Sequence, residues 1–258
     1  LAPLHIHWKL SPLITLKSFL SNPATGRVMT GPAATIDASR SEVVLFDSTR
    51  MTTISLSADK IAGRQIKPGW LSQVFVDTVN HKYFQMQIGG GQVSAWDDKE
   101  KGWKPSRGVV NPDSMRYYST IPFVNPYTGD ILLFGGYGWY HTYSVLQRFD
   151  FKTDSWQHIE TKGDQISPRG EPGICFTEDS SSVYVFGGFG NLSGEQSDGF
   201  HAIFDLWKLD LRTYTFTKLW DGGSKTIPWG AMTATRVTGD DKVYVVVRES
   251  KVPVLKSY

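Results

Sequence analysis

Three features that this chain lacks narrow the class of protein. The 258 residues include one cysteine, Cys175, so no disulfide can form within the chain. No apolar run approaches the roughly 18 residues that a transmembrane helix needs, so the sequence predicts no membrane span. The formal net charge is only +2 and no basic block stands out, so nucleic acid is not expected as a partner.

The chain is instead rich in aromatic residues. Aromatic residues make up 13% of the sequence, nine of them tryptophans, and hydrophobic residues make up 40%. This is enough apolar side chain to bury a substantial core, and single all-β domains of this length are common. Each large ring buries about 150–250 Å², so such rings are suited to contacts between neighbouring sheets.

An apolar stretch that ends in two glycines occurs twice. Residues 131–138 read ILLFGGYG and residues 182–190 read SVYVFGGFG. Each apolar run has the length and the β-branched and aromatic content of a buried strand. The glycines permit a sharp turn or a close backbone approach where a Cβ would clash. The spacing of 52 residues between Gly135 and Gly187 predicts a repeat architecture.

The residues that follow each glycine pair are repeated as well. Asp150 and Asp210 each stand at the start of a turn, and an aromatic residue follows each of them six positions later. Because Asp accepts hydrogen bonds from its own downstream amides, a strand, an Asp-led turn and a second strand are expected in each copy. Residues 94–103 form a third copy with the same spacing of Asp and Trp, just after three glycines.

This order of elements resembles the kelch repeat of β-propellers. The resemblance implies an all-β fold of the kelch type, and its motif residues build the blades, so it leaves the ligand open. The matching motif residues are Gly135, Gly136, Asp150, Trp156, Gly187, Gly188, Asp210 and Phe216.

The sequence predicts a single propeller domain, residues 1–258, with five blades, and six blades are the alternative. The C-terminal residues read as the inner strands of a blade and the N-terminal residues resemble outer ones. Strands from both ends would share one blade and close the ring without an open sheet edge. The blades are expected at residues 26–70, 71–107, 115–160 and 168–221, and at 229–258 together with 1–20.

Two groups of residues are candidates for ligand binding. Aromatic rings in a loop bury little for the fold, and exposed rings are typical anchors for proteins or sugars. The alternative is that this loop folds over its own blade. The loop candidates are Trp139, Tyr140, His141 and Tyr143. The candidates beside the expected mouth of the channel are Arg169, Glu171 and Trp229.

The resemblance also raises a copper alternative. A Tyr-His pair supplies copper ligands in the galactose-oxidase family, which shares kelch-type blades, and Tyr140-His141 is such a pair. That chemistry needs a second His, a second Tyr and a Cys crosslinked to a ligand Tyr, whereas Cys175 is expected inside a strand as a buried thiol. The sequence therefore predicts no catalytic residue, no metal site and no cofactor.

These patterns favour a non-enzymatic binding module that holds a protein or glycan partner on one face. One alternative is a carbohydrate-active or copper-dependent enzyme, and another is a structural domain of a longer multidomain protein. The start without Met and the sequon Asn191-Leu192-Ser193 favour a secreted or cell-envelope location. The oligomeric state is not predicted.

Overall fold

The computed structural model describes most of the chain, in nine segments. Among these residues the one helix is the short 3₁₀ helix η2 (Gln196–Asp198). Within them, no helix is long and apolar enough to cross a membrane. The predicted site residue Trp229 lies outside the described residues. The segments are 33–37, 39–47, 49–55, 60–67, 73–106, 117–224, 232–236, 243–249 and 252–257.

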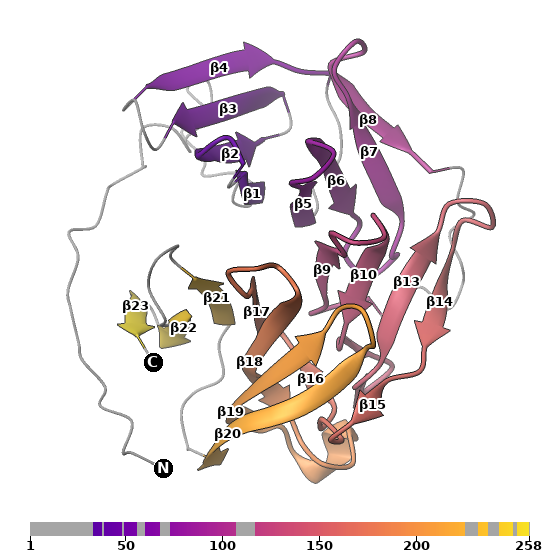
Figure 1. Cartoon of the computed structure of the whole chain (residues 1–258), viewed down its shortest axis with the longest axis vertical. Coiled ribbons are helices and arrows are strands. Elements are labelled where there is room, and N and C mark those ends of the chain that lie inside the picture. Colours follow the sequence, from indigo (N-terminus) through magenta and orange to yellow (C-terminus); the bar gives the residue numbers. More distant parts are fainter. Residues whose placement is uncertain are drawn as a thin grey trace.

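Four sheets of four or more strands stand around a central axis as the blades of a propeller (Figure 1). Neighbouring strands of the first two blades are antiparallel throughout. Blade 1 consists of β1 (Ala33–Asp37), β2 (Glu42–Phe46), β3 (Arg50–Ser55) and β4 (Ile61–Gln65). Blade 2 consists of β5 (Gln73–Asp77), β6 (Lys82–Met86), β7 (Val93–Asp97) and β8 (Gly102–Pro105).

Blades 3 and 4 contain the two clear sequence repeats. A short strand, β15 (Lys162–Gly163), joins the outer edge of blade 4 in parallel with β20. Blade 3 consists of β9 (Ile121–Val124), β10 (Ile131–Phe134), β13 (Leu146–Asp150) and β14 (Ser155–Ile159). Blade 4 consists of β16 (Arg169–Gly170), β17 (Gly173–Phe176), β18 (Ser182–Gly190), β19 (His201–Asp210) and β20 (Thr215–Ser224).

The prediction of five or six blades is wrong for the residues that the structure describes, because they form four. Their remaining strands, β21 (Met232–Arg236), β22 (Val243–Glu249) and β23 (Val252–Ser257), form a three-stranded sheet, and β21 lies beside β17. The strands expected to complete this sheet, from residues 1–20, lie outside the described residues, as does the predicted closure of the ring. The repeat spacing predicts how many repeats the chain contains. A complete four-stranded blade also requires that strands from different parts of the chain pair in one sheet.

The core lies between neighbouring blades, where the motif aromatics are placed. Trp156 of blade 3 donates its indole N–H to the carbonyl of Gly91 in blade 2, at 2.7 Å. Phe216 of blade 4 is buried with its ring centroid 5.4 Å from that of Phe134 in blade 3. Each motif aromatic therefore joins its own outer strand to the second-strand region of the preceding blade.

The Asp-led turns form as predicted. Asp150 Oδ1 accepts the backbone N–H of Lys152 at 2.8 Å. Asp210 Oδ1 accepts those of Arg212 and Thr213 at 2.9 and 2.8 Å. Because these amides favour the ionised carboxylate, they hold the pKa of both aspartates below the usual range.

The glycine pairs have the backbone geometry that the repeat requires, since all four glycines have positive φ. A Cβ on Gly135 would lie 2.6 Å from the carbonyl oxygen of Arg169 in blade 4. A Cβ on Gly188 would lie 2.6 Å from the carbonyl oxygen of Gly170. Any larger residue would push β16 away from the second strands of blades 3 and 4.

Candidate functional site

The residues after the first glycine pair form a hairpin of their own, in which β11 (Tyr137–Gly138) pairs with β12 (His141–Thr142). Trp139 and Tyr140 are its two turn residues, with φ of 52° and 61°. Positive φ at both turn positions is the pattern of a type I′ turn, which favours Asn and Gly. The left-handed backbone conformation of these two bulky residues costs about 1–3 kcal/mol each.

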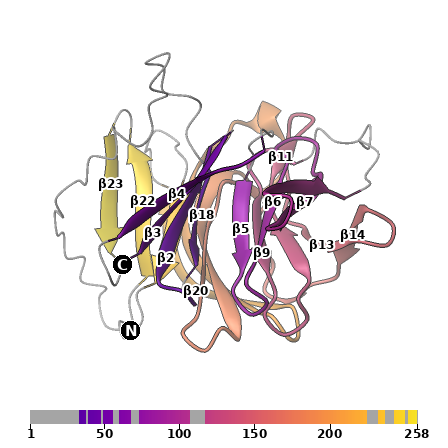
Figure 2. The ribbon, with the colours of Figure 1, turned by 90° about the horizontal axis from the view of Figure 1, so that it is seen from above.

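These two side chains point away from the protein interior. Trp139 is 59% exposed and Tyr140 is 71% exposed, so the loop does not fold over its own blade. In Figure 2, β11 lies in the upper half of the picture. That side of the molecule faces away from the viewer in Figure 1.

The hairpin docks on the loop that follows the second glycine pair. The Tyr140 carbonyl accepts the N–H of Gln196 at 2.9 Å, and the N–H of Thr142 donates to the Gly194 carbonyl at 2.8 Å. The loops of blades 3 and 4 therefore support each other through backbone hydrogen bonds. We call residues 137–143 and 191–199 together the hairpin–loop surface.

His141 and Tyr143 lie beneath the hairpin rather than at its tip. His141 Nδ1 is 3.3 Å from Glu195 Oε1, and its ring meets the Tyr143 ring edge-on at a centroid distance of 4.9 Å. The Tyr143 hydroxyl donates to the Gly138 carbonyl at 3.2 Å. His141 therefore joins the hairpin to the blade 4 loop, and Tyr143 supports His141 and the hairpin itself.

Asn191 holds the blade 4 loop together. Its Nδ2 donates to the carbonyls of Glu195 and Gly199 at 2.8 and 3.0 Å, and its Oδ1 accepts the N–H of Gly194 at 2.7 Å. The residue is only 8% exposed. Its amide is therefore not available as a glycosylation acceptor in the folded protein, and the sequon gives no support to a secreted location.

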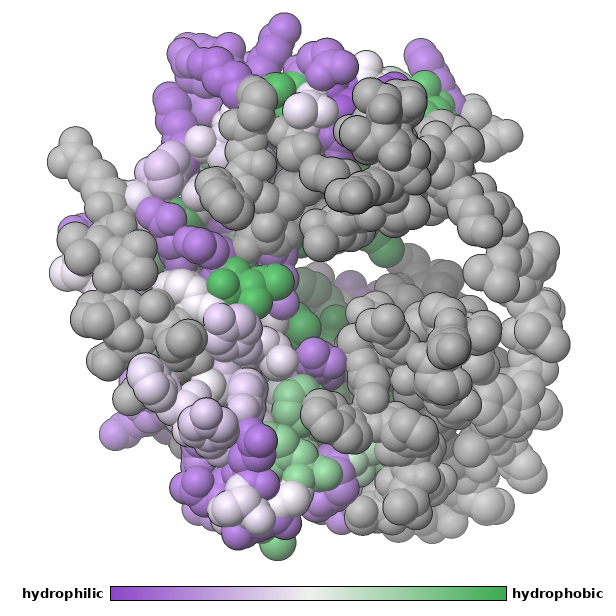
Figure 3. All heavy atoms as spheres, turned by 180° about the vertical axis from the view of Figure 1, so that it is seen from behind, coloured by the Kyte–Doolittle hydropathy of each residue, from purple (hydrophilic) through white to green (hydrophobic). Residues whose placement is uncertain are grey.

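Sequence reasoning missed Leu192, which is 90% exposed. Leu192, Tyr140 and Trp139 are the three most exposed of the large hydrophobic side chains that the structure describes, and all three lie on the hairpin–loop surface. The sequence did contain a signal of this exposure: Leu192 stands among Asn, Ser and Gly, outside any alternating pattern that predicts a buried strand. Figure 3 shows this side of the molecule, on which strongly hydrophobic residues form small green patches among purple and pale ones.

Arg169, predicted to lie beside the channel mouth, is instead fully buried in blade 4. Its Nη1 and Nη2 pair with the two carboxylate oxygens of Asp205 at 2.6 and 2.9 Å. Its other N–H groups donate to the Gly187 carbonyl, the Ser167 carbonyl and the Ser167 hydroxyl at 3.1, 3.0 and 2.8 Å. With all five donors used, Arg169 holds β16 to β18 and β19 and offers nothing to a ligand.

Glu171 lies between β16 and β17, at the same end of the blades as the hairpin. Its N–H donates to the Ser119 carbonyl at 2.7 Å, and its Oε1 accepts the Ser119 hydroxyl at 3.3 Å. The neighbouring Tyr118 is paired through its backbone with Tyr137 of β11. The structure thus brings Glu171 close to the hairpin–loop surface.

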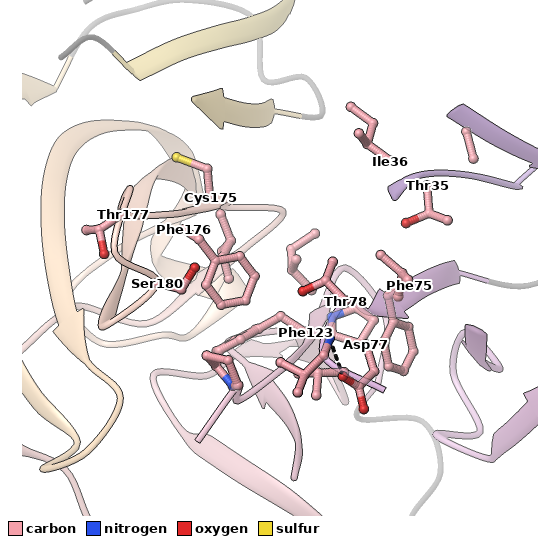
Figure 4. Close-up of a pocket in the computed structure, with 18 of the residues that line it drawn as sticks. Thr35, Ile36, Phe75, Asp77, Thr78, Phe123, Cys175, Phe176, Thr177 and Ser180 are labelled. Atoms are coloured by element: carbon pink, nitrogen blue, oxygen red, sulfur yellow. Dashed lines mark hydrogen bonds between the residues drawn. The ribbon is translucent and has the colours of Figure 1, made fainter. Parts of the chain in front are cut away.

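A separate cavity of about 700 Å³ lies near the axis, between β1, β5, β9 and β17. Its lining is mainly apolar and includes Ile36 and Val79, which are 53% and 56% exposed. Figure 4 shows Thr35 of β1 and Cys175 of β17 on opposite sides of it. Cys175 is 7% exposed, as expected for a strand interior. None of the predicted ligand-binding residues within the described segments lines this cavity.

The described part of the chain contains no group of three or more His, Cys, Asp or Glu residues placed to hold a metal ion. Tyr140 of the turn and His141 of β12 lie beside Gly194, Glu195 and Gln196 of the blade 4 loop.

The family model described as the KLHDC2/KLHL20/DRC7 Kelch-repeats domain matches residues 91–247, which is more than half of the chain. A comparison with curated proteins finds no match. The matched region contains both glycine pairs, both Asp-led turns of blades 3 and 4, and the whole hairpin–loop surface. Kelch β-propeller domains generally mediate protein interactions.

Proposed function

The chain belongs to the KLHDC2/KLHL20/DRC7 kelch-repeat family, and from that premise we propose that it is a non-enzymatic binding module that holds a protein partner on the hairpin–loop surface. The observation that carries the proposal is the turn formed by Trp139 and Tyr140. Both residues are strained and exposed, although Asn-Gly would form the same turn without strain. Backbone strain at residues whose side chains are mostly exposed is typical of a functional site.

The surface is also organised in advance for binding. The backbone hydrogen bonds from Gln196 and Thr142 join the hairpin to the neighbouring loop, so the two rings are held in place before a partner arrives. Less conformational entropy is then lost when the partner binds. Rigid Trp and Tyr side chains supply large contact areas at a low entropy cost, which is why they dominate the binding energy of many interfaces.

The predicted residues take different parts in this proposal. Trp139 and Tyr140 contact the partner, whereas His141 and Tyr143 support the hairpin from beneath. Glu171 lies at the edge of the same surface. Arg169 is left out because its side chain is buried. The role predicted for Trp229, and the assignment of residues 1–258 to one propeller domain, remain parts of the proposal.

A protein partner is favoured over the glycan partner that the sequence left open. The general role of kelch propellers in protein interactions supports the first. An extended surface with two turn aromatics and Leu192 also suits a protein, because aliphatic and aromatic anchors together are typical of protein interfaces.

The test is selection of a displayed random-peptide library on the immobilised protein, followed by affinity measurement for the selected peptides. Trp139→Ala and Tyr140→Ala are expected to weaken binding by about 1–4 kcal/mol each. Phe151→Ala is the matched control, because Phe151 is a comparably exposed aromatic residue, 53%, in the turn between β13 and β14. Circular dichroism should show that all three variants remain folded.

Two results would contradict the proposal. One is that both Trp139→Ala and Tyr140→Ala bind the selected peptides as the unmodified protein does. The other is that Phe151→Ala weakens binding as strongly as they do, since binding would then not depend on the hairpin–loop surface.

A further inference from the structure

The hairpin–loop surface carries charge of one sign. Residues 137–143 and 191–199 contain two carboxylates, Glu195 and Asp198, and no Lys or Arg. The chain as a whole has a small excess of Lys and Arg, so this local charge is opposite to the net charge of +2. Glu171, at the edge of the surface, adds a third carboxylate.

None of these three carboxylates pairs with a Lys or Arg among the described residues. Glu195 is 57% exposed, and its ionic neighbour there is the imidazole of His141. Asp198 accepts the hydroxyls of Ser193 and Ser197 at 2.6 and 3.3 Å. Hydroxyl donors leave the negative charge of the carboxylate uncompensated, so it remains available to a cation from outside.

Several carboxylates elsewhere in the blades pair with Lys or Arg, whereas others, such as Asp179 and Asp210, accept only hydroxyl or backbone N–H groups. Salt bridges join Arg64 to Asp98 at 2.9 Å and Lys104 to Asp97 at 2.5 Å in blades 1 and 2. In blade 4, Lys218 pairs with Asp221 at 2.5 Å. On the hairpin–loop surface, carboxylates without a Lys or Arg partner occur together with the three most exposed large apolar side chains of the described structure.

The apolar and acidic groups lie on two chain segments that backbone hydrogen bonds join. Leu192 and Glu195 lie on the same loop, which is closed by Asn191. Tyr140 is joined to that loop by the hydrogen bond from Gln196. The rings and the carboxylates are therefore carried by the same pair of docked loops.

We propose that this surface recognises a protein segment in which apolar side chains are followed or preceded by Lys or Arg. This inference rests on the proposed function, and it specifies the partner's chemistry. The apolar side chains cover Trp139, Tyr140 and Leu192, and the basic ones approach Glu195 and Asp198. Complementary charge of this kind speeds association and excludes acidic competitors, which like-charge contact penalises.

The experiment uses three matched sets of fluorescein-labelled synthetic peptides and measures their affinity by anisotropy. One set combines Leu and Phe with Lys and Arg, the second combines Leu and Phe with Asp and Glu, and the third combines Ser with Lys and Arg. The first set is expected to bind at least tenfold more tightly than either of the others. Its affinity should fall as salt is raised, because surface charges are screened.

Charge variants identify the groups responsible. The double variant Glu195→Lys/Asp198→Lys is expected to reverse the preference, so that the acidic apolar peptides bind more tightly than the basic apolar ones. Glu195→Gln/Asp198→Asn keeps the hydrogen-bonding capacity of the loop and should abolish the preference while leaving the fold intact. Asp98→Asn is the control, since Asp98 is an exposed carboxylate of blade 2 that pairs with Arg64.

The outcomes separate this inference from the proposed function. If Trp139→Ala weakens binding but the acidic apolar peptides bind as tightly as the basic ones, the binding module stands and the partner chemistry is wrong. Equal binding of the Ser-containing basic peptides would likewise overturn it, because charge alone would then suffice. If no set binds, this inference fails, and the proposed function is decided separately by the peptides selected from the random library. If both Trp139→Ala and Tyr140→Ala leave the affinity for every bound set unchanged, the proposed function and this inference fail together.

Discussion

Arg169 and Trp139 were both candidates for ligand binding on sequence grounds, and the structure places them in opposite situations. Arg169 is fully buried and all its donors are used within the chain. Trp139 is 59% exposed and sits in a strained turn. The first residue belongs to the framework of blade 4, which the chain satisfies by itself. The second has a strained backbone and an exposed side chain, and on this basis we propose that it contacts a partner.

The same contrast separates the kelch motif residues from the hairpin–loop surface. The motif residues Gly135, Asp210 and Phe216 each make their contacts inside the propeller. The two turn aromatics and Leu192 make few such contacts and are exposed. If this division is correct, substitutions in the framework should reduce stability, and substitutions in the surface should change binding instead.

The largest loss of stability is expected for Arg169→Ala. It leaves the Asp205 carboxylate buried without its cation, and breaking such a pair costs about 3–5 kcal/mol of unfolding free energy. Urea denaturation followed by tryptophan fluorescence measures this. Arg169→Met/Asp205→Leu removes both charges and should lose less than the single variant. An unchanged urea midpoint in Arg169→Ala would place Arg169 outside the framework.

A pair of glycine substitutions compares the two regions at two positions that both have positive φ. Gly135 has φ of 69° in the framework and Gly199 has φ of 78° in the surface loop. Gly199 has ψ of 127°, outside the left-handed helical region, and no atom lies within 4 Å of a new Cβ, so Gly199→Ala should lose about 1–3 kcal/mol of unfolding free energy from backbone strain alone. Gly135→Ala should lose about 1–3 kcal/mol more, because its Cβ meets the Arg169 carbonyl. Equal losses in thermal unfolding would mean that the close approach is not required.

Replacing the turn aromatics should increase the stability of the protein, whereas the substitutions above decrease it. The double variant Trp139→Asn/Tyr140→Gly installs the residues that a type I′ turn prefers, so it should gain about 1–2 kcal/mol of stability. It should also lose binding of the peptides selected on the unmodified protein. Thermal unfolding and fluorescence anisotropy measure the two effects on the same sample. A loss of stability would show that the rings serve the fold, and the contrast with Arg169 would disappear.

The smallest effect on stability is expected from the protonation of Asp97 at low pH. The charge and hydrogen bond of Lys104, with the amides of Glu100 and Lys99, lower the pKa of Asp97 to about 2. The ordinary value for an unfolded chain is about 3.9. Because the folded state binds its proton less readily, this contribution is present above about pH 4 and is lost as the pH falls toward about 2. Asp97→Asn should therefore show a shallower decline of the urea midpoint over that range, and an identical decline would rule Asp97 out as a cause.

Local rules explain which features could be predicted. A turn led by Asp and a glycine with positive φ depend on residues within a few positions, so the motif identified them correctly. The sequence shows Asn191 only as part of a sequon. Its structural role is not visible there, because the carbonyls of Glu195 and Gly199 become its partners only when the loop folds. Leu192 was missed for the same reason, since a loop leucine has no periodic pattern that reveals its exposure.

The sequence by itself determined the strands, the turns and the kelch type of blade, because these follow from periodicity, glycine geometry and short-range hydrogen bonds. It did not determine the number of blades that form, since that depends on pairing between distant segments. Nor did it determine which candidates face solvent. Exposure depends on neighbours from other parts of the chain. Asp205 lies far along the sequence from Arg169 and pairs with it in the interior of blade 4. No distant segment covers Trp139 to the same extent.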